Sequence, residues 1–271
     1  MHPDTVRRCF DLEAIGDHRF RAAVAGFPGV TWAYGGILIG QCGLAARATG
    51  EGRELRSSTV TFVSRTDIDE PVEIDVERVA DRGTFATRLI HVTQGGQVRA
   101  IATVLLHTFE DGPDHQLPMP TVIGPDQAVP GHPGLPVEVR DASSGRLMSG
   151  DVEEPFLDIW YRAPELAHDA PSQEAMVGYI SDLSLLEAAW RPVPDATIRH
   201  IDRIISSTLS HSMWFHEPPR LHDWVLFHAQ SPRAAAGRSL CTAHIFSSDG
   251  SLMVSVAQEG LMRFRDGAPR G

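Results

Sequence analysis

Apolar and polar residues alternate along several stretches of this chain, which is the pattern of β-strands with one buried face. In the last of these stretches, Leu252, Val254 and Val256 alternate with the residues between them. Gln258 then occupies the position of the next inward residue, and the following Glu259 is predicted to point to the other face. An uncharged amide at an inward position of a core strand therefore needs an explanation.

The elements predicted from these patterns recur in the same order in two halves of the chain. In each half a helix comes first and four strands follow, and a tight-turn dipeptide joins the last two strands, Gly95-Gly96 or Asp249-Gly250. We interpret this recurrence as an internal duplication. The predicted helices span 35–48 and 172–190, and the predicted strands span 57–63, 72–80, 84–92 and 97–109 in the first half and 206–215, 223–230, 239–247 and 251–264 in the second.

The stretch 113–136 carries a proline every few residues and has almost no apolar periodicity. We interpret it as a linker that runs over the surface, rather than an element, and joins two units, residues 1–112 and 137–271. An antiparallel sheet can bury one long helix by curling round it. The predicted fold class is therefore α+β, with two tandem units that each wrap an antiparallel sheet round a central helix.

The two predicted helices differ in composition. The helix at 172–190 is apolar on nearly every side, which indicates an interior position, and it would be roughly 27 Å long. The helix at 35–48 carries Gly35, Gly36 and Gly40, although glycine is unfavourable in a helix interior. We therefore predict close backbone packing or an exposed helix N-terminus at these glycines.

The composition indicates a soluble, acidic protein. The chain has 271 residues and a formal net charge of −11 without a basic run, which argues against extended nucleic-acid binding. No stretch approaches the roughly 18 apolar residues of a membrane span, and residues 1–20 lack the apolar core of a signal peptide. The cysteines are scattered without C-x-x-C spacing, which suits a reducing compartment. We expect a cytoplasmic protein without a cofactor.

Several catalytic classes lack their characteristic patterns in this chain. His211 and His216 lie five apart on a predicted strand, so their side chains face opposite sides and cannot share a metal ion. The sequence contains neither H-E-x-x-H nor the G-x-S-x-G elbow of serine esterases. Cys241 lies in the middle of an alternating strand, and we interpret it as a core residue. We therefore expect no metal site.

Three residues of the second half are polar where the pattern calls for apolar side chains. Asp182 lies within the second predicted helix, Thr208 near the start of the strand at 206–215, and Gln258 on the last strand. The corresponding residues of the first half are Gln41, Thr59 and Val104. The first half therefore lacks the helix carboxylate and the strand amide, and any chemistry of this polar trio is predicted for the C-terminal unit alone.

The polar trio is suited to hydrolysis. A carboxylate can orient a water molecule and accept its proton, and a hydroxyl and an amide can hold the same water or a developing oxyanion. Each residue also has a structural explanation, because a helix Asp commonly faces solvent or caps a helix, and a strand Gln commonly faces water. The residues by themselves leave both interpretations open.

Several motifs follow one another in a familiar order. The second half contains "YISDLSLL", "STLSHSMWFHEP" and "VAQEGLMR", and the first half contains "YGGILIGQ" and "DVERVADRGTFATR". Together, from about Gly35 to Arg263, they resemble the acyl-CoA thioesterase II family, whose members are double hot-dog proteins. The resemblance implies a double hot-dog fold. Such a fold exposes sheet edges and surface that usually find a partner, so we expect a homodimer or a higher homo-oligomer.

The resemblance also implies a function in lipid metabolism, the hydrolysis of an acyl-CoA to a free fatty acid and coenzyme A. In that family an Asp on the central helix, a Ser or Thr on the next strand and a Gln on the last strand hold the nucleophilic water. Carried over to this chain, the catalytic residues are Asp182, Thr208 and Gln258. Asp182 would activate the water without an acyl-enzyme intermediate, and an apolar tunnel between helix and sheet would take the acyl chain.

The chain departs from the family pattern at two places. Ser210 stands where the family usually has Asp, directly before His211, and Thr66-Asp67 replaces Pro-Gly after Arg65. The first departure favours the alternative function, that of a non-catalytic acyl-CoA-binding double hot-dog protein. The second alters one side of the region that is expected to contact the substrate.

Overall fold

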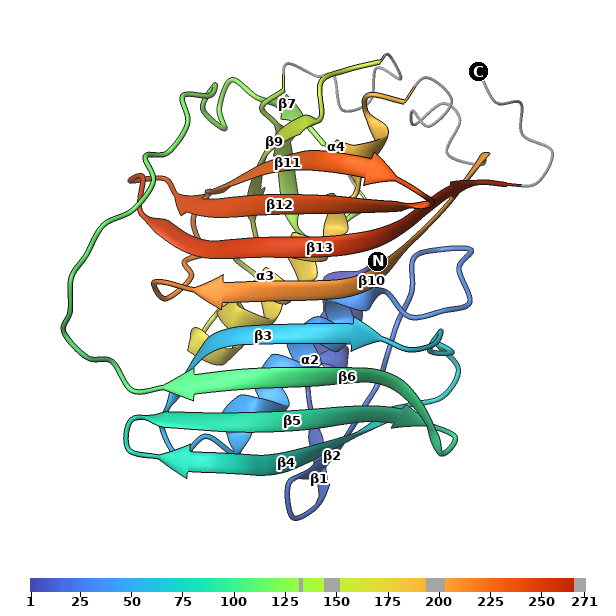
Figure 1. The fold of residues 1–271 in the computed structure, drawn as a ribbon, viewed down its shortest axis with the longest axis vertical. Coiled ribbons are helices and arrows are strands. Elements are labelled where there is room, and N and C mark those ends of the chain that lie inside the picture. Colours follow the sequence, from blue (N-terminus) through green and yellow to red (C-terminus); the bar gives the residue numbers. More distant parts are fainter. Residues whose placement is uncertain (132–133, 144–151, 194–202, 266–271) are drawn as a thin grey trace.

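The chain folds into one large antiparallel sheet with two central helices packed against one face (Figure 1). This computed structural model describes residues 1–131, 134–143, 152–193 and 203–265. The strand order in the sheet is β1-β2-β4-β5-β6-β3-β10-β13-β12-β11-β9-β8-β7. The helices are α1 (Pro3–Cys9), α2 (Gly35–Ala48), α3 (Ala170–Leu183) and α4 (Glu187–Trp190). The strands are β1 (Glu13–Gly16), β2 (Arg19–Ala22), β3 (Glu54–Phe62), β4 (Val72–Arg82), β5 (Phe85–Gln94), β6 (Gln97–His107), β7 (Val129–Pro130), β8 (Glu138–Asp141), β9 (Phe156–Arg162), β10 (Ile204–Phe215), β11 (Val225–Ala235), β12 (Arg238–Ser247) and β13 (Leu252–Phe264).

Strands β3 and β10 join the two halves at the centre of the sheet. They are antiparallel, with Thr59 opposite Ser212, and the two hydroxyls lie 2.9 Å apart. Strands β1, β2 and β4 to β6 lie on one side of this pair, and β7 to β9 and β11 to β13 lie on the other (Figure 1). The predicted α+β class, with an antiparallel sheet wrapped round central helices, is confirmed, and the sheet is continuous across the two halves.

The longer elements are those that the alternation predicted. The helix predicted at 35–48 is α2, and the eight predicted strands are β3 to β6 and β10 to β13 with only their ends displaced. The pattern missed α1, β1, β2, β7, β8 and β9. All but one of these strands have four residues or fewer, and so short a strand shows too few alternations to be recognised.

Glycines allow α2 and α3 to pack at very short distance. A Cβ atom at Gly40 of α2 would lie 2.8 Å from the carbonyl oxygen of Ala175, and one at Gly178 of α3 would lie 2.9 Å from the Gly40 nitrogen. Real Cβ atoms essentially never come so close to backbone atoms. The prediction of close backbone packing at the glycines of α2 is therefore confirmed, and it explains why two helices fit under one curved sheet.

The second central helix is shorter than predicted. The expected helix at 172–190 ends at Leu183, Ser184 leaves the helical conformation with φ −127° and ψ 3°, and α4 begins at Glu187. The prediction of a roughly 27 Å helix was wrong, and 14 residues correspond to about 21 Å. Leu185 stays fully buried across the break, so the apolar pattern continues although the helix stops.

Parts of the described segment 113–131 contact the second half of the sheet. Its Gln116 amide donates to the Gly250 carbonyl oxygen over 2.8 Å, and the Trp160 indole of β9 donates to the Ile123 carbonyl oxygen over 2.8 Å. Strand β7 falls within this segment and pairs with β8, so the expectation of a linker without any element was wrong near its end. The boundaries predicted for the two units stay a prediction.

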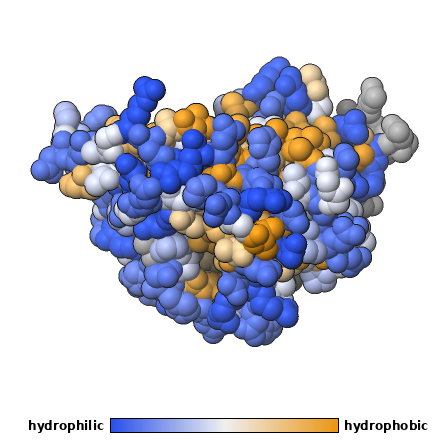
Figure 2. Space-filling view, turned by 90° about the horizontal axis from the view of Figure 1, so that it is seen from below, coloured by the Kyte–Doolittle hydropathy of each residue, from blue (hydrophilic) through white to orange (hydrophobic). Residues whose placement is uncertain are grey.

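The main core lies between the central helices and the sheet, and it extends through both halves. Viewed from below (Figure 2), the surface is mostly hydrophilic, and apolar side chains reach it in separate patches. Among the helices of the described residues, none is long and apolar enough to cross a membrane.

Candidate active site

Asp182 lies in the last turn of α3, next to the first turn of α2. A Cβ atom at Gly35 would lie 2.8 Å from Asp182 Oδ2, so only glycine at this position leaves room for the carboxylate. The N-cap residue Tyr34 makes no side-chain hydrogen bond to the end of α2. The carboxylate therefore lies at the N-terminus of α2, which is the positive end of the helix dipole.

The polar trio forms one hydrogen-bond chain. The Thr208 hydroxyl donates to Asp182 Oδ1 over 2.6 Å. The Gln258 amide donates from Nε2 to Thr208 Oγ1 over 3.0 Å. Asp182 is 9% exposed and Gln258 is 1% exposed, so the hydrogen-bond chain runs from near the surface into the interior. The structure thus brings the three expected residues together.

A β-bulge in β10 sets the direction of Thr208. Thr208 lies opposite Gly260 and Ser210 lies opposite Glu259, so Leu209 is an extra residue in the pairing with β13. An extra residue reverses the alternation of side chains along a strand. The even-numbered residues before the bulge and the odd-numbered residues after it therefore face the same side.

His211 and Ser181 extend the chain behind Gln258. His211 lies opposite Gln258 in the sheet, and its Nδ1 is 2.5 Å from Gln258 Oε1. The other ring nitrogen, Nε2, is 2.9 Å from Ser181 Oγ. Burial lowers the pKa of His211, while Asp182 and the bond to Gln258 oppose that shift, so burial favours the neutral ring. The sequence pattern indicated neither His211 nor Ser181 as part of this site, because the bulge that turns His211 inward leaves no local pattern.

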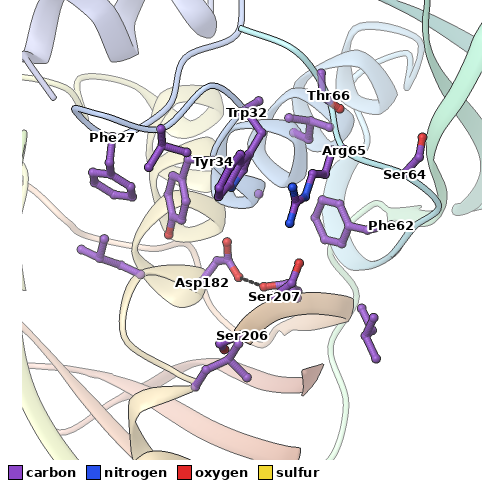
Figure 3. Close-up of a pocket in the computed structure, with 18 of the residues that line it drawn as sticks. Phe27, Trp32, Tyr34, Phe62, Ser64, Arg65, Thr66, Asp182, Ser206 and Ser207 are labelled. Carbon is purple, nitrogen blue, oxygen red and sulfur yellow. Dashed lines mark hydrogen bonds between the residues drawn. The ribbon is translucent and has the colours of Figure 1, made fainter. Parts of the chain in front are cut away.

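A cavity of about 600 Å³ opens beside Asp182 and Thr208. Figure 3 shows the rings of Trp32 and Phe62 around this space, with the guanidinium of Arg65 directed into it. The Arg65 Cζ atom lies 4.4 Å from the centre of the Trp32 ring, a cation–π contact. Further apolar lining comes from Phe27, Val30, Leu38, Leu183, Leu186 and Trp190. The cavity therefore suits a long apolar group whose end lies next to the Asp182 carboxylate.

Two further polar side chains differ in their access to this cavity. Gln258 does not line it and reaches it through Thr208. Glu187, the first residue of α4, does line it, although no motif in the sequence marked this residue. Burial raises the pKa of the Glu187 carboxyl to about 7, against the opposing effect of Arg191.

The two departures from the family pattern lie in different places. Ser210 and Ser212 share one face of β10 by alternation, and the Ser212 hydroxyl contacts Thr59 on β3. Ser210 therefore points to the face opposite His211 and away from the polar trio. Thr66, in contrast, is 4% exposed and lines the cavity, so this departure changes the wall of the candidate site.

The remaining candidate groups take no part in the site. Cys241 is fully buried, and burial raises the pKa of its thiol to about 11. Its interpretation as a core residue is confirmed. Within the described ranges, no group of three or more His, Cys, Asp or Glu side chains is placed to hold a metal ion.

Comparisons with known proteins give a consistent result across both halves. The family model described as acyl-CoA thioesterase matches residues 134–261, and the model described as acyl-CoA thioesterase N-terminal domain matches residues 24–107. Acyl-CoA thioesterase 2 of Haemophilus influenzae is 27% identical over 276 residues, covering 94% of this chain and 96% of that protein. Acyl-coenzyme A thioesterase 8 of Rattus norvegicus is 27% identical, covering 95% and 88%.

Solved structures show the same likeness. An acyl-CoA thioesterase II from Mycobacterium marinum is 27% identical, with a TM-score of 0.82 and coverage of 98% of this chain and 99% of that one. A protein from Alicyclobacillus acidocaldarius, described as having a hot dog fold, is 18% identical with a TM-score of 0.80 and coverage of 98% of both chains, and it supports the fold alone. The predicted double hot-dog fold is confirmed, and the chain belongs to the acyl-CoA thioesterase II family.

Proposed function

We propose that this protein hydrolyses the thioester of an acyl-CoA to a free fatty acid and coenzyme A, with Asp182 as the general base. The observation that carries the proposal is the Asp182 carboxylate, held by the Thr208 hydroxyl at the wall of an apolar cavity. The membership of the chain in a thioesterase family supports it.

The two carboxylate oxygens of Asp182 have different roles in this proposal. Oδ1 accepts the bond from Thr208, so Oδ2 is the oxygen that takes the proton of a bound water. The water oxygen attacks the thioester carbonyl carbon, a C–O bond forms, and the C–S bond then breaks. The proton held by Asp182 passes to the leaving sulfur, which restores the carboxylate. No acyl-enzyme forms in this scheme.

The charge that develops on the carbonyl oxygen needs donors nearby. The Thr208 hydroxyl already donates to Asp182, so Thr208 and Gln258 act in this proposal on the base and its water. We assign the carbonyl oxygen to the amide groups at the N-terminus of α2, because Gly35 lies directly beside Asp182. Such donors stabilise an oxyanion by about 10²- to 10³-fold in rate.

The cavity separates the two ends of the substrate. Its aromatic and aliphatic lining takes the acyl chain. Arg65, an exposed residue that lines the cavity, provides a cation for a phosphate group of coenzyme A.

The test is thiol release from acyl-CoAs of rising chain length, with wild type measured beside Asp182→Asn. We expect turnover in wild type and a fall of at least about 100-fold in the variant, since general-base assistance is worth about 10²–10⁴. Asp158→Asn is the matched control, because Asp158 contacts His228 on β11, away from the cavity. Turnover that is indifferent to Asp182→Asn would reject the site. Binding of acyl-CoA without thiol release at any chain length would favour the non-catalytic binding protein instead.

We also propose that the enzyme serves lipid metabolism in the cytoplasm as a homodimer or larger homo-oligomer. The strands at the two ends of the sheet are short, with four residues in β1 and two in β7, and short edge strands disfavour pairing between copies. Assembly would therefore use the broad outer face of the sheet. Sedimentation equilibrium measures the assembly, and a monomer at micromolar concentration would contradict it.

A further inference from the structure

The hydrogen-bond chain of the candidate site continues inward beyond Gln258, into a part that the hydrolysis scheme does not use. We propose that Ser181 and His211 are positioning residues that determine which end of the Gln258 amide faces Thr208. This role rests on the proposed function only where it concerns turnover, because the orientation of the amide can be measured independently.

Four consecutive hydrogen bonds link five side chains. Ser181 Oγ lies 2.9 Å from His211 Nε2, and His211 Nδ1 lies 2.5 Å from Gln258 Oε1. Gln258 Nε2 lies 3.0 Å from Thr208 Oγ1, which lies 2.6 Å from Asp182 Oδ1. The chain therefore begins on α3 at Ser181, crosses β10 and β13, and returns to α3 at the next residue.

The direction of each bond follows from the carboxylate end. An ionised Asp182 can only accept, so the Thr208 hydroxyl must donate its one hydrogen to it. Thr208 Oγ1 then accepts from the Gln258 NH₂ group, which turns the amide oxygen towards His211. That oxygen needs a donor at His211 Nδ1.

The bond between Ser181 and His211, at the inner end of the hydrogen-bond chain, is also consistent with a proton on His211 Nδ1. A neutral imidazole carries one N–H, so a proton on Nδ1 of His211 leaves Nε2 as an acceptor. The Ser181 hydroxyl is placed to donate to it over 2.9 Å, a shorter distance than the 3.3 Å from this hydroxyl to the Gly178 carbonyl oxygen. All four bonds thus run from Ser181 towards Asp182.

Burial makes the arrangement strict. Ser181 and His211 are fully buried, and Gln258 is 1% exposed. If His211 carried its proton on Nε2, its bare Nδ1 would face the Gln258 amide oxygen, and two acceptors at this distance repel each other. The amide would turn round and present its oxygen to Thr208. The single Thr208 hydrogen would then have two competing acceptors, and Asp182 would lose its fixed donor.

Two substitutions of His211 separate this role from simple packing. His211→Asn keeps an N–H donor near the position of Nδ1, whereas His211→Leu has no donor at all. We expect kcat of His211→Leu to fall about 10- to 100-fold with KM little changed, which is less than the loss of a direct transition-state donor. His211→Asn should recover kcat to within about fivefold of wild type. The matched control is His216→Asn, because His216 is an exposed histidine just beyond the end of β10. This variant should behave as wild type.

The orientation itself is read by ¹⁵N NMR of protein labelled at histidine, with the His211 signals identified by their loss in His211→Asn. We expect the neutral tautomer with the proton on Nδ1 in wild type. In Ser181→Ala, where Nε2 has lost its donor, we expect a share of the other tautomer and a lower kcat at unchanged KM.

The outcomes separate this role from the proposed function. A wild-type His211 with its proton on Nε2 would overturn the positioning role, whether or not the protein releases thiol. Equal kcat values for wild type and His211→Leu in an active enzyme would also overturn it and leave the hydrolysis intact. Absence of thiol release in wild type, with the Nδ1 tautomer present, would reject the proposed function and keep the orientation. If His211→Leu fails to fold, the His211 tautomer measured by NMR in wild type and in Ser181→Ala still tests the positioning role.

Discussion

Replacing Gly35 by alanine should remove most of the activity and leave the fold in place. The new Cβ atom would lie 2.8 Å from Asp182 Oδ2 and 3.2 Å from Phe62 Cζ, whereas ordinary contacts begin at 3.4 Å. The carboxylate therefore has to shift by several tenths of an ångström, and Oδ2 is the atom proposed to accept the proton of water. A misplacement of about 1 Å can cost about 100-fold in rate, so we expect kcat to fall about 10- to 100-fold.

The stability of this variant should change little. Alanine favours a helix over glycine by up to about 1 kcal/mol, which offsets part of the cost of moving the carboxylate. Gly43→Ala on the same helix is the matched control, because its Cβ would meet only the end of the flexible Leu55 side chain, at 3.2 Å. The assay combines steady-state thiol release with thermal unfolding. Wild-type kcat in Gly35→Ala, or an equal loss in Gly43→Ala, would refute the reasoning.

Three further expectations follow from the packing and the charges. The folded-state pKa of Glu187 is raised from 4.5 to about 7, so the folded protein binds this proton more tightly than the unfolded chain, and stability is lost as pH rises from about 4.5 to about 7. Urea unfolding across this range should show Glu187→Gln gaining up to about 3 kcal/mol on wild type, and a constant difference would contradict the shift. Gly178→Ala should lower the free energy of unfolding by about 1–3 kcal/mol, because its Cβ would lie 2.9 Å from the Gly40 nitrogen, and an unchanged midpoint would show that the helices can separate without cost. The buried Cys42 and Cys241, with thiol pKa values raised by burial to about 12 and about 11, should resist thiol reagents at pH 8 until the protein unfolds, and rapid labelling of either in the native protein would contradict their burial.

The sequence by itself determined the long strands, the helix α2 and the inward position of Gln258. These features depend on the local periodicity of apolar residues. A strand or a helix keeps its own period of side-chain directions wherever the element is placed. The same logic marked Asp182 and Thr208 as polar residues at inward positions, and the structure joins all three in one chain.

Only the tertiary structure decided how these residues meet. The bulge at Leu209 arises from the pairing of β10 with β13, and it turns Thr208 and His211 to one side although their spacing in a regular strand would separate them. The end of α3 after Asp182 is hidden in the sequence because Leu185 continues the apolar pattern into the core. Strand register and helix packing are set by partners far along the chain, so no local pattern reveals the bulge, the room that Gly35 leaves for the carboxylate, or the buried bond from His211 to Gln258.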